Sequence, residues 1–90
     1  MHCYLLYSTN EYGVSIFKAF KKLDDAIDLT NSLASYYLRS LQDVEYTGVI
    51  TNRYRLNTFD LEEKVVGYAE VYNYEGKAVY KFYIEKIPFK

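Results

Sequence analysis

The last third of the chain contains two runs dominated by apolar and aromatic residues, with a turn between them. Residues 64–72 and 77–87 are rich in Val, Tyr, Phe and Ile, the residue types that favour a pleated strand. The intervening Asn-Tyr-Glu-Gly has the composition of a turn, because Gly76 can take a positive φ without a Cβ clash. The pattern predicts a long β-hairpin over residues 64–87, around which the rest of the chain packs.

The length of this turn decides which side chains share a face of the hairpin. A turn of four residues (73–76) or of two (75–76) puts one set on one face: Val65, Gly67, Ala69, Val71, Ala78, Tyr80, Phe82 and Ile84. The opposite face then carries Val66, Tyr68, Glu70, Tyr72, Val79, Lys81, Tyr83 and Glu85. We prefer the four-residue turn, since Glu is a poor first residue for a tight two-residue turn. We reject a three-residue turn, because it would place Glu70 among Tyr80, Phe82 and Ile84.

The first forty residues predict a hairpin followed by a helix. Residues 2–8 form a short apolar run, residues 9–13 have turn composition, and residues 14–20 form a returning strand whose core face the pattern leaves open. Apolar residues then recur every three or four positions over residues 22–41, which predicts a helix of about five turns. The helix has acidic residues near its start, but Lys22 cannot cap it.

Residues 43–56 return to β propensity, with Val44, Tyr46, Gly48 and Ile50 on one face. We expect residues 53–55 to extend this strand past a bulge at Gly48 or Asn52, and residues 57–60 to form a loop. Pro88 ends the last strand, since it donates no ladder hydrogen bond. The predicted order is β-β-α-β-β-β in a single domain: an α+β two-layer sandwich, with an antiparallel sheet of four to five strands and one helix on one face.

Composition sets limits on function. Twelve of the 90 residues are tyrosine, and the net charge of −1 gives no general attraction to nucleic acid or anionic membrane. The single cysteine forms no internal disulfide, and we expect neither a signal peptide nor a membrane-spanning stretch, because the sequence has no apolar run typical of either. We therefore expect a cytoplasmic protein in a reducing compartment. The abundance of Lys, Ile, Tyr and Asn is typical of AT-rich genomes, including those of many viruses and phages.

The sequence contains no recognisable catalytic or ligand motif. His2 and Cys3 are neighbours that point to opposite faces of a strand, so we expect no zinc site, no Cys–His pair and no cofactor. The paired carboxylates at Asp24 and Asp28 suit a helix start better than acid–base catalysis. The four glycines are isolated and build no phosphate-binding loop.

Two groups of residues are candidates for binding. Tyr68, Tyr72, Lys81 and Tyr83 share the outer face of the hairpin, where aromatic rings could form a protein interface or stack on single-stranded bases. Alternation also puts Arg53 and Arg55 on one side of an extended segment, as a clamp for a phosphate or carboxylate. The alternative interpretations are cross-strand tyrosine pairing for the first group and a charge-protected edge strand for the second.

The leading hypothesis is a small non-enzymatic protein-interaction module that uses the Tyr-rich sheet face. Its concrete form is a viral or phage accessory protein that binds a host factor, or a two-fold homodimer formed by self-association. The alternative is a single-stranded nucleic-acid-binding protein that uses the same face with Arg53 and Arg55. Near-zero net charge counts against the alternative, because phosphate neutralisation supplies most non-specific affinity.

Overall fold

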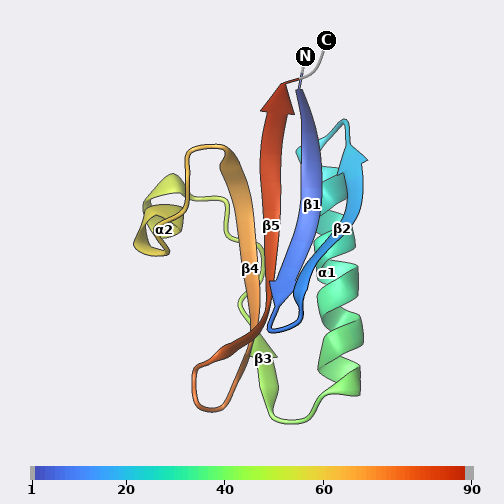
Figure 1. Ribbon diagram of the computed structural model, residues 1–90, viewed down its shortest axis with the longest axis vertical. Helices are drawn as coiled ribbons and strands as arrows, with labels where there is room; N and C mark the ends of the chain where they lie inside the picture. Colours follow the sequence, from blue (N-terminus) through green and yellow to red (C-terminus); the bar gives the residue numbers. More distant parts are fainter. Residues whose placement is uncertain (1, 89–90) are drawn as a thin grey trace.

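The computed structural model describes residues 2–88, which form five strands and two helices. In chain order these are β1 (His2–Asn10), β2 (Gly13–Phe20), α1 (Leu23–Ser40), β3 (Val44–Tyr46), α2 (Arg53–Thr58), β4 (Val65–Asn73) and β5 (Ala78–Pro88). The strands form one sheet in the order β2-β1-β5-β4-β3, and every neighbouring pair is antiparallel (Figure 1). The predicted α+β class and strand sequence are confirmed, with one added helix between β3 and β4.

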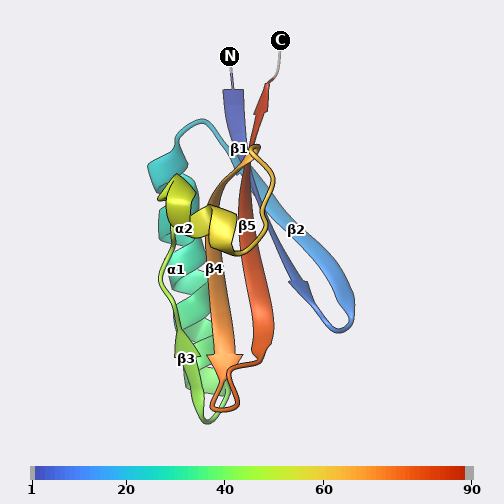
Figure 2. The same ribbon diagram turned by 90° about the vertical axis from the view of Figure 1, so that its left-hand side faces the viewer.

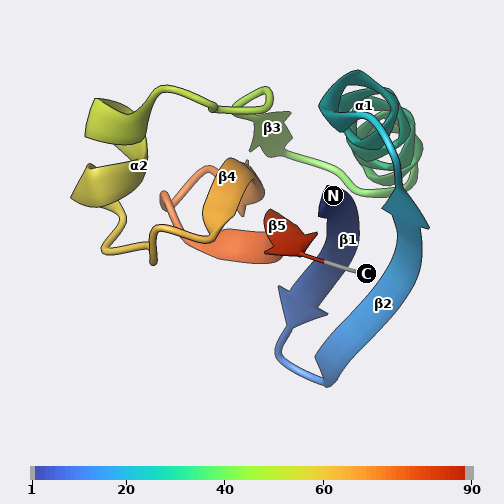
Figure 3. The same cartoon turned by 90° about the horizontal axis from the view of Figure 1, so that it is seen from above.

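The main core lies between the sheet and α1. Seen from above, the sheet is curved and α1 lies inside the curve, while α2 lies outside it beside β4 (Figure 3). Leu6, Phe82 and Ile84 are buried on the inner face and cluster with Ala26 and Ala34 of α1. Small alanines at these helix positions let the helix approach the sheet closely. The inner face of the sheet is therefore the one that packs against α1.

The predicted helix over residues 22–41 forms α1 almost within its predicted limits. Ala26, Thr30 and Ala34 of the predicted stripe are buried. Lys22 occupies the N-cap and makes no side-chain capping bond, as expected from its chemistry. Asp24 compensates in part, because a carboxylate in the first turn interacts favourably with the helix dipole.

The turn between β4 and β5 is the three-residue turn that we rejected from the sequence. The Asn73 N–H donates to the Lys77 carbonyl at 2.9 Å, and the Gly76 N–H donates to the Asn73 carbonyl at 2.9 Å. Gly76 has φ +80°, the left-handed conformation that a three-residue hairpin requires. A second irregularity compensates: the register shifts between Val71 and Tyr72, so that Glu70 lies opposite Lys81 and the two share a face, as predicted. The central strand faces are therefore those predicted, although the turn is not.

The two ends of the hairpin differ from the predicted faces. Beyond the shift near the turn, Tyr72 pairs with Ala78, and Val79 packs against the main core. A second shift between Val65 and Gly67 pairs Val65 with Glu85. Each irregularity inserts one extra residue, and one extra residue exchanges the faces of everything beyond it. Strict alternation therefore failed for these end residues.

The strand predicted over residues 43–56 is wrong after Tyr46. Gly48 has φ +76°, and this break turns Val49 toward the main core while Ile50 bridges to Tyr68 on the opposite side. Asn52 then caps a short helix, its side-chain oxygen accepting from the Tyr54 N–H at 2.9 Å. An Asn followed by residues of good helix propensity is a capping signal that strand-like neighbours obscured.

The added helix partly covers the face of the sheet opposite α1, which we call the outer face. Leu56 of α2 is buried with Ile50 and Tyr68 in a second, smaller cluster, against which Leu61 and Tyr83 pack. Figure 2 shows α2 in front of β4, with the β1–β2 turn standing away from it. One helix thus covers one face, as predicted, but a second helix covers part of the other.

Candidate functional site

The outer face carries a row of aromatic rings that crosses three strands. Tyr7 of β1 pairs with Tyr83 of β5, and Tyr83 pairs with Tyr68 of β4. The rings of Tyr7 and Tyr83 are stacked, with centroids 5.0 Å apart, and those of Tyr83 and Tyr68 are 5.2 Å apart at a tilt of 60°. Phe59 continues the row, 5.0 Å from Tyr68. Direct cross-strand pairing brings these residues together from distant parts of the sequence.

Tyr68 is a structural residue of this row. Its exposed fraction is 3 %, because Ile50 and Leu56 cover it. Its hydroxyl donates to the Glu70 carboxylate at 2.6 Å. Burial, followed by that hydrogen bond, raises the pKa of Tyr68 well above the ordinary tyrosine value. Tyr68 therefore has no surface to offer a partner, which removes it from the predicted binding group.

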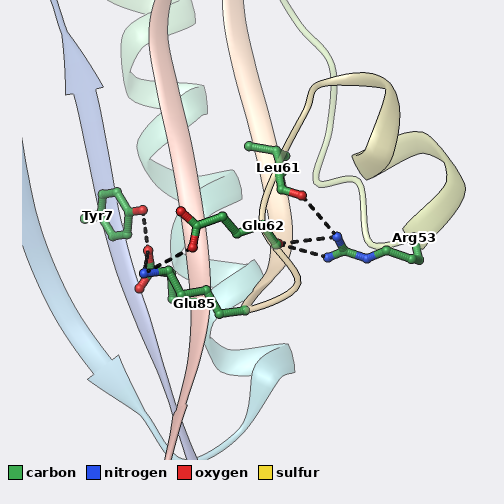
Figure 4. A network of polar contacts seen from close by, with 6 residues as sticks. Tyr7, Arg53, Leu61, Glu62 and Glu85 are labelled. Atoms are coloured by element: carbon green, nitrogen blue, oxygen red, sulfur yellow. Dashed lines mark hydrogen bonds and ion pairs between the residues drawn. The ribbon is translucent and has the colours of Figure 1, made fainter.

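Tyr7 lies at the other end of the row and makes a similar bond. Its hydroxyl donates to a Glu85 carboxylate oxygen at 2.6 Å (Figure 4). The pKa of Tyr7 is raised above the ordinary tyrosine value. Burial is the largest cause, and the hydrogen bond to Glu85 is the next. Lys64 balances that carboxylate, with Nζ 3.9 Å from Glu85 and 3.5 Å from Glu62. The carboxylates of this face are thus held by tyrosine hydroxyls and a lysine.

The remaining predicted hairpin residues are half-buried on the same face. Lys81 lies directly opposite Glu70 on one side and Thr9 on the other. The Tyr72 hydroxyl donates to Glu45 at 2.7 Å, across the β3–β4 pair, and this bond raises the pKa of Tyr72. Tyr72 therefore lies at the β3 end of the sheet, and Tyr83 and Lys81 lie nearer its middle.

Arg53 and Arg55 do not form the predicted clamp. Residues two apart on a helix point in widely different directions, so the alternation argument fails once this segment is α2. The Arg53 guanidinium donates to the carbonyls of Leu61 and Glu62 (Figure 4). It also donates to the Val65 carbonyl, and together these bonds tie α2 to the start of β4 and the loop before it. Arg55 is exposed. Arg53 is therefore committed to internal bonds.

An uncovered apolar area adjoins the aromatic row on β1 and β2. Val14 and Ile16 of β2 pair with Thr9 and Tyr7, and their exposed fractions are 65 % and 70 %. Together with the neighbouring outer-face residues they form what we call the open outer surface: Leu5, Tyr7, Thr9, Val14, Ile16, Lys81 and Tyr83. The sequence pattern missed its β2 part, because a register shift opposite Leu6 and Tyr7 interrupts the alternation of that strand.

A pocket of about 400 Å³ opens between the two hairpin turns and the exit of α1. Tyr12, Leu41, Tyr80 and Lys77 are among its lining residues. Glu11 and Lys77 are its charged residues, and its lining includes no cysteine or histidine. The lining therefore contains no Cys–His pair.

The described residues show little else that suggests chemistry. Within residues 2–88, no group of three or more His, Cys, Asp or Glu side chains is placed to hold a metal ion. Over the same residues, neither helix has the length and apolar character needed to cross a membrane. Comparison of the chain with protein-family models, curated proteins and solved structures finds no match.

Proposed function

We propose that the chain is a small protein-interaction module whose contact area is the open outer surface. The observation that carries the proposal is the exposure of Val14 and Ile16 beside the stacked Tyr7–Tyr83 pair. Exposed aliphatic residues next to aromatic rings are typical of the centre of a protein interface. A rigid sheet also presents these side chains with little loss of conformational entropy on binding.

The charges of this face favour a protein partner over a nucleic acid. Lys81 lies opposite Glu70, and Lys64 lies within 4 Å of Glu85, so each lysine of this face has a carboxylate beside it and the face has no excess of positive charge. Binding to phosphates needs cations that are free to replace counterions. A partner with an apolar contact surface and a polar rim requires no such excess charge. We therefore expect the partner to be a folded protein that presents aliphatic or aromatic side chains.

The proposal is tested by comparing which proteins the chain retains from a lysate of its source cells. Thr9→Arg adds bulk at the centre of the open outer surface, and Tyr83→Ser removes one of its rings. Tyr54→Ala is the matched control, since Tyr54 on α2 is 85 % exposed and lies outside the surface. We expect a protein that the wild type and the control retain and that both surface variants lose. Circular dichroism and thermal unfolding confirm that each variant is folded.

Other results would contradict the proposal. If all four chains retain the same proteins, or if none retains any, the open outer surface is not the contact area. Fluorescence anisotropy with labelled single-stranded RNA and DNA at low salt tests the alternative directly. If the wild type binds at concentrations of about 10 μM and Tyr83→Ser does not, the partner of the open outer surface is a nucleic acid and not a protein.

A further inference from the structure

β2 is an edge strand, and its first part, residues 13–16, precedes the register shift and has little to protect it from pairing. It is hydrogen-bonded to β1 alone, so its other edge carries backbone N–H and C=O groups with no strand partner. Every residue of β2 before Phe20 is exposed. The strand contains no proline, and Lys18 is its one charged residue. Such an edge is a template for another strand.

The opposite edge of the sheet is shorter and is tied to the neighbouring helix. β3 has three residues, and Glu45 is at its centre. The hydroxyl of Tyr46 donates to Asn31 of α1 at 2.7 Å, which ties this strand to the helix beside it. A short, charged edge is a poor template. Edge pairing between copies would therefore use β2 from both chains, which gives a closed two-fold dimer instead of an open chain of molecules.

We propose that β2 pairs antiparallel with β2 of a second copy, about a two-fold axis at Ser15. This pairing joins two five-stranded sheets into one of ten strands. It goes beyond the proposed function, because it uses the backbone edge of the sheet and leaves the Tyr7–Tyr83 part of the open outer surface free. The two-fold axis is perpendicular to the joined sheet, so both open outer surfaces lie on the same side of it.

The side chains of β2 are self-complementary in this register. Val14 of each copy lies opposite Ile16 of the other, and an aliphatic pair is favourable at adjacent strand positions. Lys18 lies beyond the register shift, opposite Leu6, with its ammonium group 5.4 Å from the centroid of its own Phe20 ring, so it lies outside the contact between Val14 and Ile16. The pairing thus places Val14 and Ile16 of the two copies side by side along the joined strands and opposes no like charges.

Sedimentation velocity of the full chain at increasing concentration is the first test. We expect a reversible monomer–dimer equilibrium. Ile16→Lys should raise the dimer dissociation constant about tenfold, because the symmetry places the substitution in the contact twice, once from each copy. The matched control is Tyr36→Lys on α1, which replaces another well-exposed apolar residue (61 %) and should leave the dimer unchanged. Tyr83→Ser should also leave it unchanged, which separates this inference from the proposed function.

Amide hydrogen exchange then identifies the edge as the contact. If the strands pair, the β2 amides that point away from β1 should exchange at least tenfold more slowly as the fraction of dimer increases. If the two copies dock through side chains alone, these amides should exchange as fast as in the monomer. A chain that stays monomeric at about 1 mM would overturn the inference. So would a dimer whose β2 amides exchange as fast as those of the monomer, or one that Ile16→Lys does not weaken.

Discussion

The tyrosines of this chain are used for both their rings and their hydroxyls. On the outer face, Tyr7, Tyr68 and Tyr72 each donate to a glutamate, at distances between 2.6 and 2.7 Å. A phenylalanine would pack as well but would leave these carboxylates with one fewer partner. On the inner side, Tyr37 of α1 stacks on Tyr80 with ring centroids 4.0 Å apart. Much of the unusual tyrosine content therefore has a structural explanation.

These hydroxyls predict how stability depends on pH. Burial raises the pKa of Tyr46 to about 12, and burial followed by a glutamate bond raises the pKa of Tyr7 and Tyr68 further. Above pH 10 the unfolded chain loses these protons while the folded chain keeps them, so the free energy of unfolding falls as pH rises. Below the unfolded pKa both states are protonated, and these groups add no pH dependence.

Urea denaturation between pH 8 and pH 11.5 measures this decline. We expect Tyr68→Phe to be less stable than the wild type by about 1 kcal/mol at pH 8, because it loses the bond to Glu70. The variant should also lose stability less steeply above pH 10, since one of the protected protons is gone. Equal slopes in the two proteins would show that Tyr68 ionises as readily in the folded state as in the unfolded state.

The helix α2 is stabilised by a cap at its start, by one buried side chain and by hydrogen bonds from Arg53 to the loop after it. Asn52 caps the start, Leu56 enters the outer-face cluster, and Arg53 holds the loop that follows. An isolated helix of six residues would not be stable in water, since nucleation costs more than so few bonds return. Its stability therefore comes from contacts with β4 and the loop over residues 61–65.

Arg53 and Arg55 form a matched pair for testing this view. Arg53→Gln should lower the free energy of unfolding by about 2 kcal/mol, because charged hydrogen bonds to several loop carbonyls are lost. Arg55→Gln should change it by less than about 0.5 kcal/mol, since that side chain is exposed. Chemical denaturation of both variants measures the difference. If both variants lose the same free energy of unfolding, the hydrogen bonds of Arg53 add no stability beyond that of an exposed positive charge.

The molecule as a whole consists of a sheet with a large core on one face and a small cluster on the other. The main core joins α1 to β1, β4 and β5, whereas the outer cluster depends on Ile50, Leu56 and Tyr68. Segments with few buried apolar contacts open at lower free energy than the core does. The α2 segment is therefore expected to open locally, without unfolding of the sheet.

Amide exchange of the native protein tests this order of stability. Amides of α2 should exchange at least tenfold faster than those at the centre of β4 and β5, because their opening exposes the smaller cluster alone. Leu56→Ala should accelerate exchange in α2 while leaving the sheet amides almost unchanged. Uniform acceleration of all amides by this substitution would mean that the two clusters unfold as one unit.

The sequence alone determined most of the secondary structure and the inner core. The helical period over residues 22–41 and the β propensity of the last hairpin are strong local signals, and both elements formed near their predicted limits. Glu70 and Lys81 also fixed which face the central residues of the hairpin occupy, because neither is stable when buried without a partner, whereas the register itself differs from that of the preferred four-residue turn. Of the predicted binding residues, Tyr83, Lys81 and Tyr72 lie together on the predicted face.

Only the tertiary structure decided how much of that face is accessible. Tyr68 is covered because α2 folds over it, and α2 depends on contacts between residues far apart in the chain. Register shifts in β2, β4 and β5 likewise depend on the partner strand, since an extra residue is visible only when two strands are aligned. Local pattern thus specifies which segments form strands and helices, and long-range packing selects the surface that remains for binding.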